Sequence, residues 1–250
     1  MPRQTLRTLV GHQRTRAANR RLGLLLAAVA GAINAGGFLA IQRYTSHMTG
    51  IVSGVADDLA LGHGGLALAG VLLVAVFISG AITTTVLIHW ARRRRMHSEF
   101  ALSLLLEAGL LLAFGLLGAN LAHTSALLVP ATAALLCFIM GLQNAMVTKI
   151  SQAEVRTTHM TGVITDLGIE LGKLLYWNRQ PDSPAEPMVR ANRDRLRLHA
   201  ALLGSFAGGG LAGALAFQWL SFYATVPIAL LLAAMAAVPI LDDLQGAGAG

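Results

Sequence analysis

The sequence predicts an all-α integral membrane protein, with about six transmembrane helices and two octet-led helices that are short or re-entrant, arranged as an inverted internal repeat. Composition is the first observation: of the 250 residues, 55% are hydrophobic and 12% are charged, and the mean hydropathy is +0.62. Soluble domains usually carry about 25% charged residues, so this chain is expected to be embedded in a bilayer. The second observation is a series of long apolar runs, and the third is an octet that occurs twice.

The chain begins with a basic segment, residues 1–21, which contains six arginines and no acidic residue. A basic segment before an apolar run can imitate a cleaved signal peptide. Here the run is followed by further membrane segments and takes part in an internal repeat, so we interpret it as an uncleaved first transmembrane helix. The basic segment itself is predicted to be cytoplasmic.

A single membrane domain is predicted over residues 22–240, because its apolar segments follow one another almost continuously. A spanning helix needs about 20 apolar residues. The runs that meet or approach this length are 22–41, 66–90, 101–119, 126–148, 198–217 and 222–240. The stretch 178–197, with three prolines and mixed charge, is predicted to be a cytoplasmic loop, and residues 241–250 are predicted to be a flexible tail.

Two further segments begin with nearly the same octet. The first octet, TSHMTGIV, covers Thr45–Val52, and the second octet, TTHMTGVI, covers Thr157–Ile164. The segments that they open, 47–61 and 159–176, are shorter or more polar than a lipid-exposed span should be. They can be re-entrant half-helices or full spans, and the octets alone do not choose between these alternatives.

The distribution of basic residues favours the re-entrant alternative. Fifteen of the 19 Lys and Arg residues fall in three clusters, at the N-terminus, at 92–95 and at 179–197, and the loops 119–125 and 218–225 carry none. Basic clusters lie on the cytoplasmic side, so an even number of crossings must separate them. Six crossings with two re-entrant segments meet this condition and place both termini in the cytoplasm. Eight crossings would place the run 92–95 outside.

The repeat extends beyond the octets on both sides. Upstream, GAINA at 31–35 aligns with GLQNA at 141–145. Downstream, FISGAITTTVLIHW at 77–90 aligns with FAGGGLAGALAFQW at 206–219. The order within each half is therefore helix, octet segment, helix, helix.

With three crossings per half, the second half is inverted relative to the first. The first repeat covers about 22–119 and the second about 126–240. Inverted repeats with broken, polar segments at equivalent positions are typical of transporters whose site lies near the membrane midplane. We therefore predict that the two octets build two sides of one site.

These motifs also carry a family resemblance, which covers roughly residues 22–240. A first helix containing Gly and Asn, an HMTG octet that opens a short polar helix, and six or so spans resemble the YoaK-like family of bacterial membrane proteins. The most specific element is Ser/Thr-His-Met-Thr-Gly. The family is a domain of unknown function, and the resemblance implies a bacterial inner-membrane location without implying a substrate.

The octets supply most of the predicted solute-binding residues. Their hydroxyl side chains can cap the octet helices, and the backbone N–H groups of a first turn attract an anion or a carboxylate. The alternative is capping alone, with the glycines allowing close helix packing. The histidines can donate to the solute, carry protons or serve structure, and the asparagines can contact the solute or join helices. The predicted set is Thr45, Ser46, His47, Thr49, Thr157, Thr158, His159, Thr161, Asn34 and Asn144.

Four acidic residues are predicted to couple transport to protons or to pair structurally. Asp58 aligns with Glu170 when the octets are superposed, and Asp166 lies one helical turn before Glu170. Glu107 is an isolated acid in the third apolar run. Acids at membrane depth cost about 2.5–3.5 kcal/mol on insertion scales, so they normally face a cavity or a partner.

The predicted function is a secondary transporter or permease for a small polar or anionic solute. Two alternatives remain open: an integral-membrane enzyme that acts on a lipid-borne substrate, and a non-catalytic membrane assembly factor. The lone Cys137 leaves no cysteine-based zinc motif, and no nucleotide-binding or hydrolase motif is present. We therefore expect no cofactor, no metal and no nucleic acid. The expected partners are the lipid bilayer and a small molecule or ion.

Overall fold

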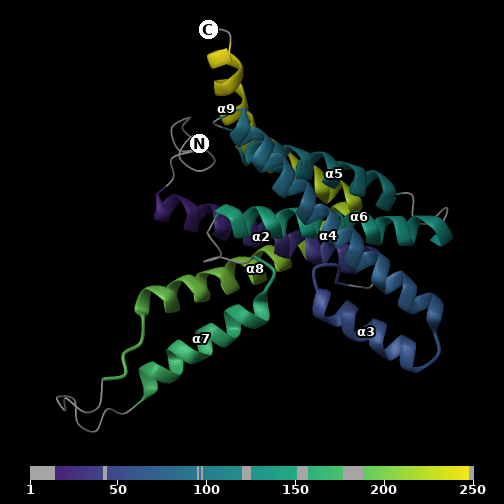
Figure 1. Cartoon of the computed structure of the whole chain (residues 1–250), viewed down its shortest axis with the longest axis horizontal. Coiled ribbons are helices and arrows are strands. Elements are labelled where there is room, and N and C mark those ends of the chain that lie inside the picture. Colours follow the sequence, from purple (N-terminus) through teal and green to yellow (C-terminus); the bar gives the residue numbers. More distant parts are fainter. Residues whose placement is uncertain are drawn as a thin grey trace.

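The computed structural model describes residues 15–41, 44–94, 96, 98–119, 125–150, 157–176 and 188–247. Within these ranges every regular element is a helix (Figure 1). The elements are α2 (Arg16–Ile41), α3 (Met48–Ala60), α4 (Gly64–Arg93), α5 (Ala101–Ala119), α6 (Ser125–Ile150), α7 (Met160–Leu175), α8 (Arg193–Leu220), the short 3-10 helix η1 (Ser221–Ala224) and α9 (Thr225–Ala247).

Five helical stretches of the described chain are long and apolar enough to cross a membrane. They are Ala17–Leu39, Gly64–Arg93, Ala101–Ala119, Val129–Ile150 and Arg193–Leu241. The last of them contains α8, η1 and the part of α9 up to Leu241. The prediction of an all-α, multi-pass membrane protein is confirmed at this level.

The octet helices are too short to cross by themselves. α3 has 13 residues and α7 has 16, and at about 1.5 Å per residue both are shorter than a hydrocarbon core of about 30 Å. α3 folds back on α4 after a turn in which Gly62 has φ +77°, a conformation that favours glycine. α7 packs on α8. Figure 1 shows α3 and α7 diverging, with their first turns towards the middle of the molecule.

The two halves of the sequence pack crosswise. α2 of the first half lies along α8 of the second, and α4 of the first half lies along α6 of the second. A Cβ atom at Gly31 would overlap the carbonyl oxygen of Phe206, and a Cβ atom at Gly141 would overlap that of Phe77. These four positions are equivalent in the aligned repeats, so the same backbone approach occurs twice.

A second matched pair of glycines completes each crossing. A Cβ atom at Gly80 would overlap the carbonyl oxygen of Phe138, and one at Gly209 would overlap that of Ala28. Ala28 and Phe138 are again equivalent positions. Without a hydrophobic driving force in lipid, close backbone packing of this kind is a main source of helix association.

The α5–α9 and α2–α6 pairs both run antiparallel. In the α5–α9 pair, the Ser98 backbone N–H just before α5 donates to Asp243 Oδ2 near the end of α9, at 2.9 Å. At the other end of this pair, Gly115 lies beside Thr225. In the α2–α6 pair, Gln143 Nε2 donates to the Leu26 carbonyl at 3.5 Å.

The α2–α6 direction follows from a second contact, since a Cβ atom at Gly37 would lie 3.0 Å from Leu136 Cδ1. Going from Leu26 to Gly37 along α2 therefore leads from Gln143 back to Leu136 along α6. Side chains buried in this region include Leu26, Ile33, Leu136 and Met140.

The end of the chain differs from the prediction. α9 continues to Ala247, so the first seven residues of the expected flexible tail are helical. The contact of Asp243 with the Ser98 backbone gives a physical reason, because it ties the last turns of α9 to the start of α5. Residues 178–187 of the predicted loop lie outside the described residues, and α8 begins at Arg193, before the apolar run starts.

Candidate functional site

Each octet is joined to the helix that precedes it by one hydrogen bond to an asparagine. Ser46 Oγ donates to Asn34 Oδ1 of α2 at 2.8 Å. Thr158 Oγ1 donates to Asn144 Oδ1 of α6 at 2.5 Å. We call these pairs the first junction and the second junction. The structure thus brings each predicted asparagine to its own octet, at equivalent positions of the two halves.

The expectation that octet hydroxyls cap the short helices is wrong. α3 and α7 begin at Met48 and Met160, so the capping positions belong to His47 and His159, and neither side chain makes a capping hydrogen bond. The hydroxyls of Ser46 and Thr158 are used by the junctions instead.

The first threonine of each octet points into the protein. Thr45 and Thr157 are buried, and neither hydroxyl has a hydrogen-bond partner among the described residues. The Thr45 carbonyl accepts from Cys137 Sγ of α6 at 3.7 Å, which holds the first octet against that helix. A hydroxyl placed in this way cannot reach the first turn of the octet helix.

The imidazole rings explain why the octet carries glycine three residues after histidine. A Cβ atom at Gly50 would overlap the His47 ring, and a Cβ atom at Gly162 would overlap the His159 ring. Both rings therefore lie over the first turn of their own helix while the residues remain exposed. The spacing His-x-x-Gly is the sequence signal for this arrangement, because residues three apart share a helix face.

Within the ranges that the structure describes, the first turns of α3 and α7 keep backbone N–H donors that no side chain caps. In α3 the first intrahelical bond from the capping position runs from the Ile51 N–H to the His47 carbonyl, at 3.2 Å, and in α7 the matching bond joins Val163 to His159, also at 3.2 Å. The amides before these bonds have no side-chain cap. Thr49 and Thr161 are exposed in these first turns. Such amides can bind a negative or polar group.

Glu170 serves as a structural link from α7 to α8. Its Oε2 accepts from the Asn192 backbone N–H at 2.6 Å, and its Oε1 accepts from Lys173 Nζ at 2.9 Å. Asn192 in turn caps α8. The backbone N–H of Asn192, followed by Lys173, holds the pKa of the Glu170 carboxyl below its usual range.

The aligned acid makes the corresponding link in the first half. Asp58 Oδ1 lies 3.6 Å from Nδ1 of His63, the residue at the capping position of α4. Proton coupling and structural pairing were both possible for Asp58 and Glu170, and this geometry favours structural pairing. Asp166 is more than half exposed, and its Oδ2 lies 3.8 Å from His199 Nε2.

Glu107 is the buried acid without a visible partner. It is fully buried in α5, and neither carboxyl oxygen has a hydrogen-bond partner among the described residues. Ser103, one turn earlier on the same face, is also buried, and its hydroxyl is unpaired within the described chain. An acid in this position normally faces a pathway or a partner group.

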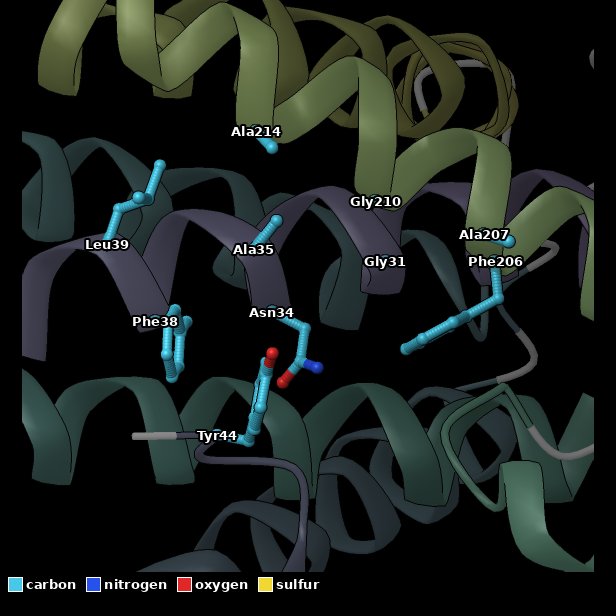
Figure 2. Close-up of a pocket in the computed structure, with 10 residues that line it drawn as sticks. All are labelled: Gly31, Asn34, Ala35, Phe38, Leu39, Tyr44, Phe206, Ala207, Gly210 and Ala214. Carbon is cyan, nitrogen blue, oxygen red and sulfur yellow. The ribbon is translucent and has the colours of Figure 1, made fainter. Parts of the chain in front are cut away.

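Two cavities flank the first junction. One, of about 310 Å³, lies between α2 and α8; we call it the Asn34 cavity (Figure 2). Its ten lining residues are Gly31, Asn34, Ala35, Phe38, Leu39, Tyr44, Phe206, Ala207, Gly210 and Ala214. The other, of about 320 Å³, lies between α3 and α4 and is bordered by His47, Gly50 and Asp58. Tyr44 borders both cavities.

Sequence reasoning missed the aromatic residues of the Asn34 cavity. Phe38 and Tyr44 stack on each other with ring centroids 4.6 Å apart and an interplanar angle of 19°. They are four and ten residues beyond Asn34 and do not recur in the second half. Phe206 recurs as Phe77, but alignment alone does not show which face of its helix it occupies.

The structure does not join the two octets directly. No hydrogen bond or ion pair links the first octet to the second among the residues that the structure describes. In the same part of the chain, no group of three or more His, Cys, Asp and Glu residues is arranged to hold a metal ion.

The chain belongs to the family described as "Protein of unknown function (DUF1275)", which matches residues 22–238. The match covers the membrane domain with both octets, and it agrees with the resemblance seen in the sequence. Searches of curated proteins and of solved structures found no match.

Proposed function

We propose that this protein is a permease that moves a small polar or anionic solute by alternating access, through a site near the membrane midplane built by the two octet half-helices. The observation that carries the proposal is the matched pair of junctions. Asn34 and Asn144 occupy equivalent positions on two antiparallel helices, and each accepts a hydrogen bond from its octet. A transporter has a use for such duplication, since it must present one site to two sides in turn.

An inverted repeat is supported by the packing of the helices. Two of the glycine contacts of α2 with α8, those of Gly31 and Gly209, recur between α6 and α4 at the equivalent positions. Six crossings with re-entrant octets require α2 to run against α6, and α5 against α9. Eight crossings would make both pairs parallel. Both pairs are antiparallel in the structure, so the contacts favour six crossings.

The junctions connect the two units that would move. One unit consists of α2 with α8 and α7, and the other of α6 with α4 and α3. Ser46 leads into α3 of the second unit but binds Asn34 of the first, while Thr158 leads into α7 of the first unit but binds Asn144 of the second. Rocking the units apart on one face would break one junction and leave the other closed. A bound solute can replace the hydroxyl at the opened asparagine.

Glu107 is the residue that we assign to proton coupling. Its carboxyl is buried in α5 and has no hydrogen-bond partner among the described residues, whereas Asp58, Asp166 and Glu170 all have neighbours that account for them. We place the protein in the bacterial inner membrane with both termini cytoplasmic, because the basic clusters then all face the cytoplasm.

Uptake into proteoliposomes tests the function. We expect the reconstituted protein to take up at least one member of a panel of small anions, amino acids and neutral polar solutes, and Glu107→Gln to abolish any stimulation by a pH gradient. Protein that is monodisperse and thermally cooperative but takes up no member of the panel, with or without a gradient, would contradict the proposal.

Cysteine accessibility tests the topology. In a Cys137→Ser background, a cysteine at Ser221 should react with a membrane-impermeant maleimide from the periplasm, whereas one at Arg94 should react only after the membrane is opened. Reaction of the Arg94 cysteine from outside would support eight crossings and remove the inverted repeat.

A further inference from the structure

The Asn34 cavity has aromatic walls and one amide. Figure 2 shows the Asn34 side chain between the ring of Tyr44 and the ring of Phe206, which approach from opposite sides. Phe38 backs the Tyr44 ring as its stacking partner. The cavity volume of about 310 Å³ is at the lower end of the range of roughly 300–1,000 Å³ for small-molecule sites. A molecule with a single ring and a short polar group suits this volume.

The Asn34 amide offers a donor that no residue in the described part of the chain uses. Asn34 Oδ1 accepts from Ser46 Oγ, so Nδ2 is the atom left facing the cavity. No atom of the described chain accepts a hydrogen bond from Nδ2, although a side-chain amide carries two N–H donors. A ligand that carries an acceptor would satisfy this group.

The uncharged lining of the Asn34 cavity disfavours ionic ligands. None of the ten residues that line the cavity is acidic or basic. An ion that entered would lose its hydration without gaining an opposite charge, which is unfavourable for either sign. The aromatic rings, the Tyr44 hydroxyl and the Asn34 amide donor therefore suit a neutral molecule with a planar body.

We propose that the Asn34 cavity binds a neutral, planar solute with a carbonyl acceptor, of the aromatic or heterocyclic carboxamide class. The acceptor binds Asn34 Nδ2, and the ring lies between Tyr44 and Phe206. This inference rests on the proposed function insofar as the bound molecule is the solute that the permease moves. It narrows the solute from polar or anionic to neutral.

Three probes of nearly the same shape test which ligand charge the cavity accepts and whether the Asn34 amide donates to the ligand. Benzamide, benzoate and benzamidine have nearly the same shape and are neutral, anionic and cationic at neutral pH. Binding to the purified full-length protein in lipid nanodiscs is measured by saturation-transfer NMR and calorimetry. We expect benzamide to bind at least about tenfold more tightly than either ion. Benzoate binding as tight as benzamide binding, or no binding of benzamide, would overturn the proposal.

Substitution of the amide separates a ligand contact from a packing role. Asn34→Asp keeps the oxygen that accepts from Ser46 and replaces the donor with a second oxygen. We expect it to weaken benzamide binding by about fivefold, the worth of one hydrogen bond, and to strengthen benzamidine binding over wild type. If the folded Asn34→Asp variant bound benzamide and benzamidine with equally reduced affinity, the result would argue against the proposed contact.

The aromatic wall has an internal control. Phe206→Leu should weaken benzamide binding, whereas Phe77→Leu, the same change at the equivalent position beside Gly141, should leave it unchanged. Equal effects of the two variants would overturn the assignment of Phe206 to the cavity wall.

The cavity assignment and the transport proposal can fail separately. Benzamide binding without uptake of benzamide would refute transport of this class of solute but leave the binding site intact. Uptake of other solutes without benzamide binding would refute the cavity assignment alone.

Discussion

One turn beyond Asn34, α2 carries Phe38 and Leu39, whereas the same positions of α6, one turn beyond Asn144, carry Thr148 and Lys149. The side-chain amides of Asn34 and Asn144 also differ. Asn34 leaves Nδ2 facing a cavity, while Asn144 Nδ2 donates to the Met140 carbonyl of its own helix at 2.7 Å. The hydrogen bond to the octet is nevertheless present at both junctions. The glycine crossings and the junctions are thus alike in the two halves, whereas the positions one turn beyond the junction asparagines have diverged.

The largest effect is expected where the halves are most alike, at the glycine crossings. Gly31→Ala and Gly141→Ala each place a Cβ against a backbone carbonyl that cannot move alone. Overpacking of this kind costs about 1–3 kcal/mol. We expect both variants to lower the midpoint of thermal unfolding in detergent to a similar extent. Gly208→Ala is the control, because a Cβ atom there meets nothing within 4 Å; a Gly31 variant as stable as this control would contradict the crossing.

A smaller effect, unequal between the halves, is expected at the acid links. Glu170→Gln weakens two hydrogen bonds of a buried carboxylate, whereas Asp58→Asn weakens one longer contact to a half-exposed histidine. Glu170→Gln should therefore lower the unfolding midpoint more.

The pH dependence of the Glu170 link has a definite sign. Because the folded-state pKa of Glu170 is lowered, its stabilisation is present above the ordinary value of 4.5 and is lost as the pH falls below it. The difference between wild type and Glu170→Gln should thus shrink in that window. A difference that grew on acidification would contradict the assignment.

The junction bonds should contribute little stability and much activity. Interhelical hydrogen bonds in membranes average about 0.6 kcal/mol, so Ser46→Ala and Thr158→Val should each shift the unfolding midpoint only slightly. If the junctions close alternately, each variant should reduce uptake, with the loss appearing in the maximal rate. Unchanged uptake in both variants would remove the junctions from the mechanism.

The smallest change in stability is expected in the first turns of the octet helices. Thr49 and Thr161 are exposed, and exposed substitutions usually stay within about 0.5 kcal/mol. Thr49→Val and Thr161→Val should leave unfolding unchanged and impair uptake, because they remove hydroxyls beside the free amides. An uptake rate equal to wild type in both variants would leave the first turns without a role in binding.

Local patterns predicted the scaffold well. Aligning the octets and their flanks singled out Gly31, Gly80 and Asn34, and each of these makes a contact that its counterpart repeats. Matched residues in a repeat occupy matched environments, so one alignment carries information about two places in the fold.

Contacts between distant segments could not be predicted in this way. The partner of Glu170 is a backbone N–H at Asn192, 22 residues away. A contact to a backbone group cannot be predicted from the pattern of side chains, because every residue except proline carries the same N–H group. The cavity combines Phe38 and Tyr44 with Phe206, and the packing of α2 against α8 decides that these residues line one cavity. The place of His47 at the N-terminal capping position of α3 was missed because hydroxyl residues are in general the stronger capping residues.

A cavity present at one junction has a kinetic consequence for a carrier built on equal halves. If the carrier is passive, a solute that fits the side of Asn34 better than the side of Asn144 has different half-saturating concentrations on the two faces of the membrane. No net flux can occur at equal concentrations, so the ratio of maximal rate to half-saturating concentration must be the same in both directions. The face with the tighter site must then have the slower maximal rate, so transport from that face saturates at a low solute concentration, whereas transport from the opposite face reaches a higher maximal rate.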